Sequence, residues 1–168
     1  MTRLLIILLF TSSAIANIGN QKRFSIDIPS NWQMMKGFYG VPFTFLAPGS
    51  TATGRPTIQV IPSDQAEFKI DAKRMKYFDS KNKKGKEIWL KEHDGVLLKY
   101  EPMQEIKVGS QKMYITRSVY KVKSNTYDSK RYYTFCDGKF FEIRTMTNLV
   151  HKDAAIKNKK ILESFQCK

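Results

Sequence analysis

Few residues in this chain have the types and spacing that catalysis or metal binding requires. The 168 residues include two histidines, His93 and His151, and two cysteines, Cys136 and Cys167. Neither histidine has another histidine, a cysteine or a carboxylate at the spacing of a metal-ligand motif. We therefore interpret both histidines as surface or helix-capping residues, and the sequence predicts neither a metal site nor a cofactor.

Patterns for a nucleophile are incomplete as well. Gly49-Ser50 does not complete the Gly-x-Ser-x-Gly elbow of serine hydrolases, and a cysteine nucleophile needs a histidine base beside it. No glycine-rich phosphate loop is present. The sequence therefore predicts no catalytic residue. Scattered carboxylates of the expected strands leave open whether two of them meet in space: Asp27, Glu101, Glu105 and Glu142.

The two cysteines predict a structural disulfide between Cys136 and Cys167. A redox-active pair usually has the spacing Cys-x-x-Cys, which is absent here. In an oxidising compartment the bond would tie the C-terminal tail to an interior strand. Closing this loop is worth about 3.5 to 4 kcal/mol in the chain-entropy model. Two free thiols are the alternative.

The N-terminus indicates the compartment. Arg3 precedes the apolar run Leu4–Phe10, and Ala14 and Ala16 are small residues at the positions that signal peptidase recognises. This pattern predicts a secretory signal peptide over residues 1–16, cleaved between Ala16 and Asn17. A retained membrane anchor is the alternative, but it needs about 20 apolar residues, and polar residues follow this run too early.

Residues 17–168 are long enough for one domain with its own core and contain no repeat or linker. We expect this domain to be periplasmic or secreted, without a transmembrane segment. The chain has 29 lysines and arginines against 15 acidic residues, a net charge of +14, and the predicted signal peptide contributes only Arg3 to it. Such a surface favours an envelope protein or an anionic envelope component as partner, and export argues against nucleic acid. An ordinary solvated surface is the alternative.

Apolar and polar residues alternate along much of this domain, which is typical of half-buried strands. Asp137-Gly138 predicts a tight hairpin between the last two strands. Tyrosines crowd the central strands, where they either form a binding face or pack the sheet. The expected strands are Phe24–Ile28, Phe43–Leu46, Thr57–Ile61, Ile88–Leu90, Val96–Glu101, Met113–Lys123, Tyr132–Cys136 and Phe140–Thr147.

Two helices are expected. The first would begin at Ser63-Asp64, with Glu67 as the reciprocal partner of the Asp64 cap, and would end near Lys81-Asn82, before Gly85. The second would begin at Asp153 and end just before Cys167. Helices segregated from a mainly antiparallel sheet make an α+β layered domain.

Three segments frame most of this domain: Phe24–Trp32 (FSIDIPSNW), Pro56–Ile61 (PTIQVI) and Ile161–Phe165 (ILESF). A strand followed by Pro-x-x-Trp, and a closing helix that ends in Ser-Phe, resemble the PsbP-like family, whose fold is shared with the Ran-binding Mog proteins. The resemblance implies an α/β/α sandwich and a non-catalytic role as an exported accessory factor. It assigns no site residue to this sequence.

We therefore expect an exported, non-catalytic accessory or partner-binding protein of the bacterial envelope. Two alternatives stay open. One is a periplasmic immunity-type protein that neutralises a toxin, and the other is an enzyme whose site the motifs above do not reveal.

Overall fold

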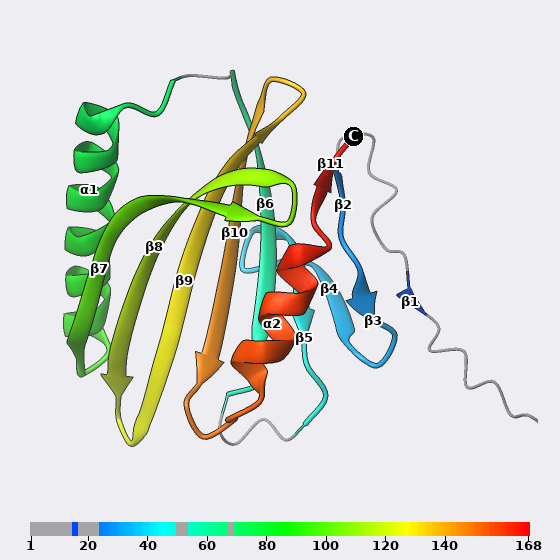
Figure 1. Cartoon of the computed structure of the whole chain (residues 1–168). Helices are drawn as coiled ribbons and strands as arrows, with labels where there is room; N and C mark the ends of the chain where they lie inside the picture. The colour runs from blue at the N-terminus through cyan, green and yellow to red at the C-terminus, as the bar shows by residue number, and fades with distance from the viewer. Residues whose placement is uncertain (1–14, 17–23, 50–53, 67–68) are drawn as a thin grey trace, which may run out of the picture.

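The computed structural model describes residues 15–16, 24–49, 54–66 and 69–168 (Figure 1). Their main feature is an antiparallel sheet of seven strands in the order β4-β5-β6-β10-β9-β8-β7. The strands are β4 (Gln33–Phe38), β5 (Val41–Leu46), β6 (Thr57–Ala66), β7 (Gly95–Val108), β8 (Gln111–Val122), β9 (Asn125–Cys136) and β10 (Lys139–Asn148). The expected α+β fold class is confirmed.

Two helices and two small ladders complete the part of the chain that the structure describes (Figure 1). Helix α1 (Ala72–Glu92) precedes β7, and helix α2 (Ala154–Glu163) follows β10. β2 (Phe24–Ser25) pairs with β11 (Gln166–Cys167), and β1 (Ile15–Ala16) pairs with β3 (Ile28–Pro29). Among the residues described, no helix is long and apolar enough to cross a membrane.

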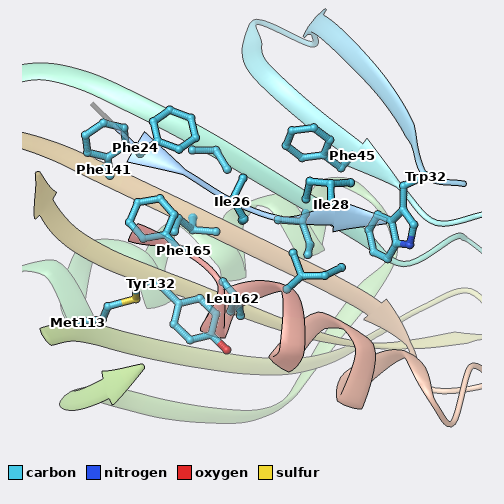
Figure 2. Packing of buried hydrophobic residues seen from close by; sticks show 14 of the residues in the cluster. Phe24, Ile26, Ile28, Trp32, Phe45, Met113, Tyr132, Phe141, Leu162 and Phe165 are labelled. Carbon is cyan, nitrogen blue, oxygen red and sulfur yellow. The ribbon is translucent and has the colours of Figure 1, made fainter. Parts of the chain in front are cut away.

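Each face of the sheet has its own hydrophobic cluster, because neighbouring side chains of a strand point to opposite faces. Met113, Tyr132 and Phe141 belong to a large cluster with the N-terminal segment and α2, which Figure 2 shows. Tyr133 and Phe140, each next to one of these in sequence, belong to a smaller cluster on the α1 side. The seven strands are therefore covered by different elements on their two faces.

The disulfide expected between Cys136 and Cys167 is present. It joins β9 to β11 with a Cα–Cα distance of 4.9 Å and a sequence separation of 31 residues. The chain end that follows α2 is thereby fixed to an interior strand of the sheet.

The start predicted for the first helix is wrong. The helix begins at Ala72, and Asp71 caps it by accepting a hydrogen bond from the Arg74 backbone N–H at 2.8 Å. β6 continues past Pro62, because β5 pairs with β6 only as far as Val60 and the β10 ladder shifts register here. Proline is tolerated at such an edge, where no partner needs its missing N–H.

The end predicted for that helix is also wrong. α1 continues through Gly85 to Glu92 and includes the expected strand Ile88–Leu90. A glycine inside a helix costs only about 1 kcal/mol relative to alanine, and burial of Leu90, which is 2% exposed, offsets it. Tertiary packing therefore overrides the local signal.

β7 is bent so that its second half crosses the α2 side of the sheet (Figure 1). Its pairing with β8 shifts register between Glu101 and Gln104, around Pro102. A bulge of this kind bends a strand. The hairpin tip then meets the end of α2: a Cβ on Gly109 would lie 2.9 Å from the backbone oxygen of Glu163.

The predicted signal peptide lies outside the described residues, except for the backbone of Ile15 and Ala16 in β1. Asn17, on the other side of the predicted cleavage point, also lies outside them. Cleavage and export stay predictions.

Gly109→Ala tests the contact between the hairpin tip and α2. Gly109 has a φ of 58°, and a residue other than glycine pays about 1 to 3 kcal/mol in this region. The clash with the Glu163 carbonyl adds to that cost. Gly138→Ala is the matched control, since its φ is 67° and no atom lies within 4 Å of the added Cβ. We expect urea unfolding to show a larger loss for Gly109→Ala, and equal losses would contradict the contact.

Candidate functional site

The first candidate site is a cavity of about 490 Å³ between α2 and the sheet. The bent hairpin β7–β8 supplies one wall with Ile106 and Val108, and α2 supplies the other with Ile156 and Leu162. Tyr132 of β9 lies beside Leu162 on the same side of the sheet (Figure 2). The exposed surface of the walls is mainly apolar, so this cavity suits a hydrophobic group.

One polar atom in this cavity lacks a partner. Asn158 of α2 is 4% exposed, and its Nδ2 donates to Thr147 Oγ1 at 3.0 Å. Its Oδ1 is buried and accepts no hydrogen bond from any described residue. A buried acceptor without a donor costs about 1 to 3 kcal/mol. Asn158 is therefore a polar residue of the cavity wall whose buried acceptor is not satisfied by any described residue.

Charged side chains at the edge of this cavity hold each other in place. Arg117 makes a two-point contact with Asp128, at 2.9 and 3.1 Å, and a third hydrogen bond to Glu101 at 3.0 Å. The hydrogen bonds that Arg117 donates to Asp128 raise the pKa of Arg117, and Glu101 adds to this effect. Burial raises the pKa of Tyr132, and the nearby Asp128 carboxylate raises it further. Arg117 therefore stays charged and Tyr132 stays neutral near neutral pH.

A second cavity, of about 680 Å³, lies at the other side of α2. Trp32, His151 and the α2 lysines Lys157 and Lys160 line it. Three proline residues, Pro29, Pro48 and Pro56, also belong to its wall. This cavity is more polar at its rim than the first, and its excess of lysine makes it electropositive.

A cluster of cations lies on the opposite face of the sheet, under α1. Arg144 of β10 makes a two-point contact with Glu142, at 2.7 and 2.9 Å, and Arg131 of β9 lies 3.7 Å from the same carboxylate. Arg131 also donates to Asn82 Oδ1 of α1 at 3.0 Å, and Asn82 donates to Tyr133 at 2.9 Å. Helix and sheet are thus joined by one polar network.

Lys86 is the third cation of this cluster. Its Nζ lies 4.1 Å from the ring centroid of Tyr120 and 5.0 Å from that of Trp89. Burial, together with the positive charges of Arg131 and Arg144, lowers the pKa of Lys86 to about 8. The charged form of Lys86 is therefore destabilised by its surroundings, and the two cation–π contacts offset only part of that free-energy cost.

Comparison with solved structures finds proteins of similar fold. A PsbP from the cyanobacterium Synechocystis matches with a TM-score of 0.60 and 14% identity, covering 86% of each chain. LpqN of Mycobacterium tuberculosis, described as involved in cell envelope biogenesis, matches with a TM-score of 0.52 and 15% identity over 86% of this chain and 83% of LpqN.

The chain has a PsbP-like fold.

A Bacteroides thetaiotaomicron protein also matches, with a TM-score of 0.53 and 16% identity over 86% of this chain, which spans 45% of that protein. No protein-family model matches, and no curated protein matches in sequence. At these identities the comparisons establish the fold, and the chemistry of the PsbP-like domain has to be argued from its own residues.

The residues that sequence analysis considered for chemistry lie apart in the PsbP-like domain. His93 ends α1, where its Nδ1 lies 2.8 Å from the Trp89 carbonyl oxygen, whereas His151 lines the larger cavity. Glu101 and Glu142 take part in networks on opposite faces of the sheet. Within the described ranges, no three histidine, cysteine or acidic side chains are placed to hold a metal ion.

Sequence reasoning missed the residues that define both candidate sites. Asn158 and Lys86 belong to no sequence motif, and Lys86 lies beyond the end predicted for the first helix, near Lys81-Asn82. A correct helix boundary would have put Asn82 and Lys86 one turn apart on α1, facing the sheet. The cross-strand register of Arg131 with Arg144 follows from the Asp137-Gly138 hairpin, so that pair could have been found.

Lys86→Met tests whether the cluster is destabilising. Methionine keeps the aliphatic stem and removes the charge, so the variant is expected to gain about 1 kcal/mol or more in free energy of unfolding in phosphate-free buffer near pH 7. Because the pKa of Lys86 is lowered in the fold, its penalty is complete below about pH 8 and declines as pH rises toward the ordinary lysine value. Urea unfolding of both proteins from neutral to alkaline pH measures this gain. A destabilised variant would contradict the assignment.

Proposed function

We propose that this protein is an exported, non-catalytic binding protein of the bacterial envelope, which takes an amphiphilic ligand into the cavity beside α2. The observation that carries the proposal is a cavity with a mainly apolar surface, whose wall includes Asn158 with a buried and unpaired Oδ1. Ligand sites are typically concave and apolar, with a few polar groups that fix orientation. The cavity volume of about 490 Å³ falls within the usual size range for them.

The chemistry of the cavity selects its ligand. Ile106, Val108 and Ile156 accept an aliphatic chain, and Asn158 Oδ1 accepts one hydrogen bond from a hydroxyl or an amide N–H. Lys107 and Lys130 at the rim favour an anionic or strongly polar head. An envelope amphiphile combines these three properties.

The proposal that the protein is exported is supported by other features of the chain. The signal pattern that ends at Ala16 directs the protein out of the cytoplasm, and the Cys136–Cys167 disulfide suits an oxidising compartment. The electropositive chain suits the anionic surfaces found there. The toxin-neutralising and enzymatic alternatives stay predictions, since no contact in the described residues favours either.

Export can be tested independently of the ligand. We expect protein recovered from the periplasm to begin at Asn17 and to contain no free thiol, because cleavage and oxidation both follow translocation. Intact mass with and without reduction measures both. Native protein that stays in the cytosol with Met1 and two thiols would overturn the proposed location.

Ligand binding can be tested with octyl glucoside below its critical micelle concentration, followed by NMR shifts of α2 and β7. This probe has an aliphatic chain and several hydroxyl donors. Ala155→Trp is expected to block the cavity, because exposed Ala155 lines it. Lys157→Trp is the matched control, since it is also exposed on α2 but lines the other cavity. Equal binding by wild type and Ala155→Trp would exclude this cavity as the site.

Asn158→Leu then separates recognition from stability. Loss of the acceptor is expected to weaken octyl glucoside binding roughly 3- to 10-fold, the value of one hydrogen bond. The free energy of unfolding should change by less than about 1 kcal/mol, because removing an unpaired acceptor compensates for the lost contact with Thr147. Unchanged affinity would show that Asn158 does not take part in binding.

A further inference from the structure

The face of the sheet under α1 holds an unusual arrangement of like charges. Arg131 of β9 and Arg144 of β10 are direct cross-strand partners. Their side chains lie on the same face, because both contact the carboxylate of Glu142. Like charges placed opposite each other destabilise a sheet unless something compensates for them. Glu142 compensates for one positive charge of this pair.

Helix α1 adds a further positive charge instead of a second carboxylate. Lys86 lies over the rings of Tyr120 and Trp89, and it forms no ion pair with any carboxylate that the structure describes. Its lowered pKa has repulsion by both arginines among its causes. Asp79 lies one turn before Asn82 on α1. Its carboxylate accepts hydrogen bonds from the Tyr100 hydroxyl and the Met103 backbone N–H. Three cations and one carboxylate therefore leave this cluster with two positive charges.

The cluster is open to solvent on its outer side. The side chains of Arg131 and Arg144 are 30% and 37% exposed, and Lys86 is half-buried. Asn82 holds Arg131 in position, and Glu142 holds Arg144. Two guanidinium groups are thereby oriented before any ligand arrives, which lowers the entropic cost of binding.

We propose that Lys86, Arg131 and Arg144 form a binding site for a phosphate group, either inorganic phosphate or a phosphate monoester. The planar fork of arginine matches phosphate oxygens in two-point contacts, and lysine adds a point charge. A phosphate monoester carries close to two negative charges at neutral pH, which equals the excess charge of the cluster. A carboxylate or a phosphodiester carries one and would leave a cation uncompensated.

This site is separate from the cavity beside α2, because the two lie on opposite faces of the sheet. Trp89 lies next to Lys86 and is 39% exposed, so it offers ring surface to the carbon skeleton of a monoester. Free phosphate and a monoester share the recognition chemistry, and they differ in whether that ring gains contacts.

The test is a titration of the mature protein, followed by ¹⁵N NMR, in buffer of constant ionic strength set with chloride. Inorganic phosphate, glycerol 3-phosphate and dimethyl phosphate are compared. The first two are expected to shift the signals of α1, β9 and β10, and dimethyl phosphate, a diester with one charge, is expected to bind about tenfold more weakly or worse. Tighter binding of glycerol 3-phosphate than of phosphate would assign the site to a monoester. The reverse order would assign it to free phosphate.

Lys86→Met is the decisive variant, and Lys84→Met is its control. Both lie on α1 and lose one positive charge, but Lys84 is exposed and outside the cluster. We expect Lys86→Met to bind phosphate about tenfold more weakly while its thermal midpoint without phosphate rises, so that weak binding cannot be ascribed to unfolding. Lys84→Met should bind as the wild type does. Equal losses in both variants would show diffuse attraction by a basic protein and would overturn the site, as would a wild type that does not distinguish phosphate from chloride.

Discussion

The packing of Phe165 against Phe24 and Phe141 fixes the C-terminal helix on the sheet, and the arrangement of the elements around α2 depends on it. Phe165 stacks on Phe24 at 5.7 Å and meets Phe141 edge-on at 6.2 Å. Its side chain is 1% exposed. One residue earlier, Ser164 Oγ accepts a hydrogen bond from the Asp27 backbone N–H at 2.8 Å. The N-terminal segment, the sheet and α2 are therefore held together at one point, which the disulfide two residues later reinforces.

This constraint explains why cavities flank α2. A ten-residue helix held at its C-terminal end cannot cover a face seven strands wide. The N-terminal segment fills one side of the remaining surface, and the bent β7–β8 hairpin reaches the other. The spaces left between these elements and α2 are the two cavities. Their position follows from the fold, and the side chains that line them decide which ligands they accept.

Most of the strands and the last helix could be predicted from sequence because their signals are local, although β4 is not among the predicted strands. Alternation along Met113–Lys123, the Asp137-Gly138 turn and the helix start at Asp153 each depend on a few residues. The boundaries of α1 could not be predicted, because Phe78 stacks on Tyr133 of a distant strand and Leu90 is buried by tertiary packing. The same holds for both candidate sites. Asn158 and Lys86 are unremarkable in sequence, and only the fold shows that neither has the partner its chemistry requires.

The two candidate sites share one physical property: each holds a polar or charged group without a partner that a single substitution would remove. A hydrophobic residue at position 158 would remove a buried, unpaired acceptor, and an uncharged one at position 86 would relieve repulsion by two arginines. Structures that keep such costs usually do so where a ligand supplies the missing partner. A donor in the cavity and an anion under α1 are the partners that these two groups lack, and each would stabilise the folded state in proportion to its affinity for it.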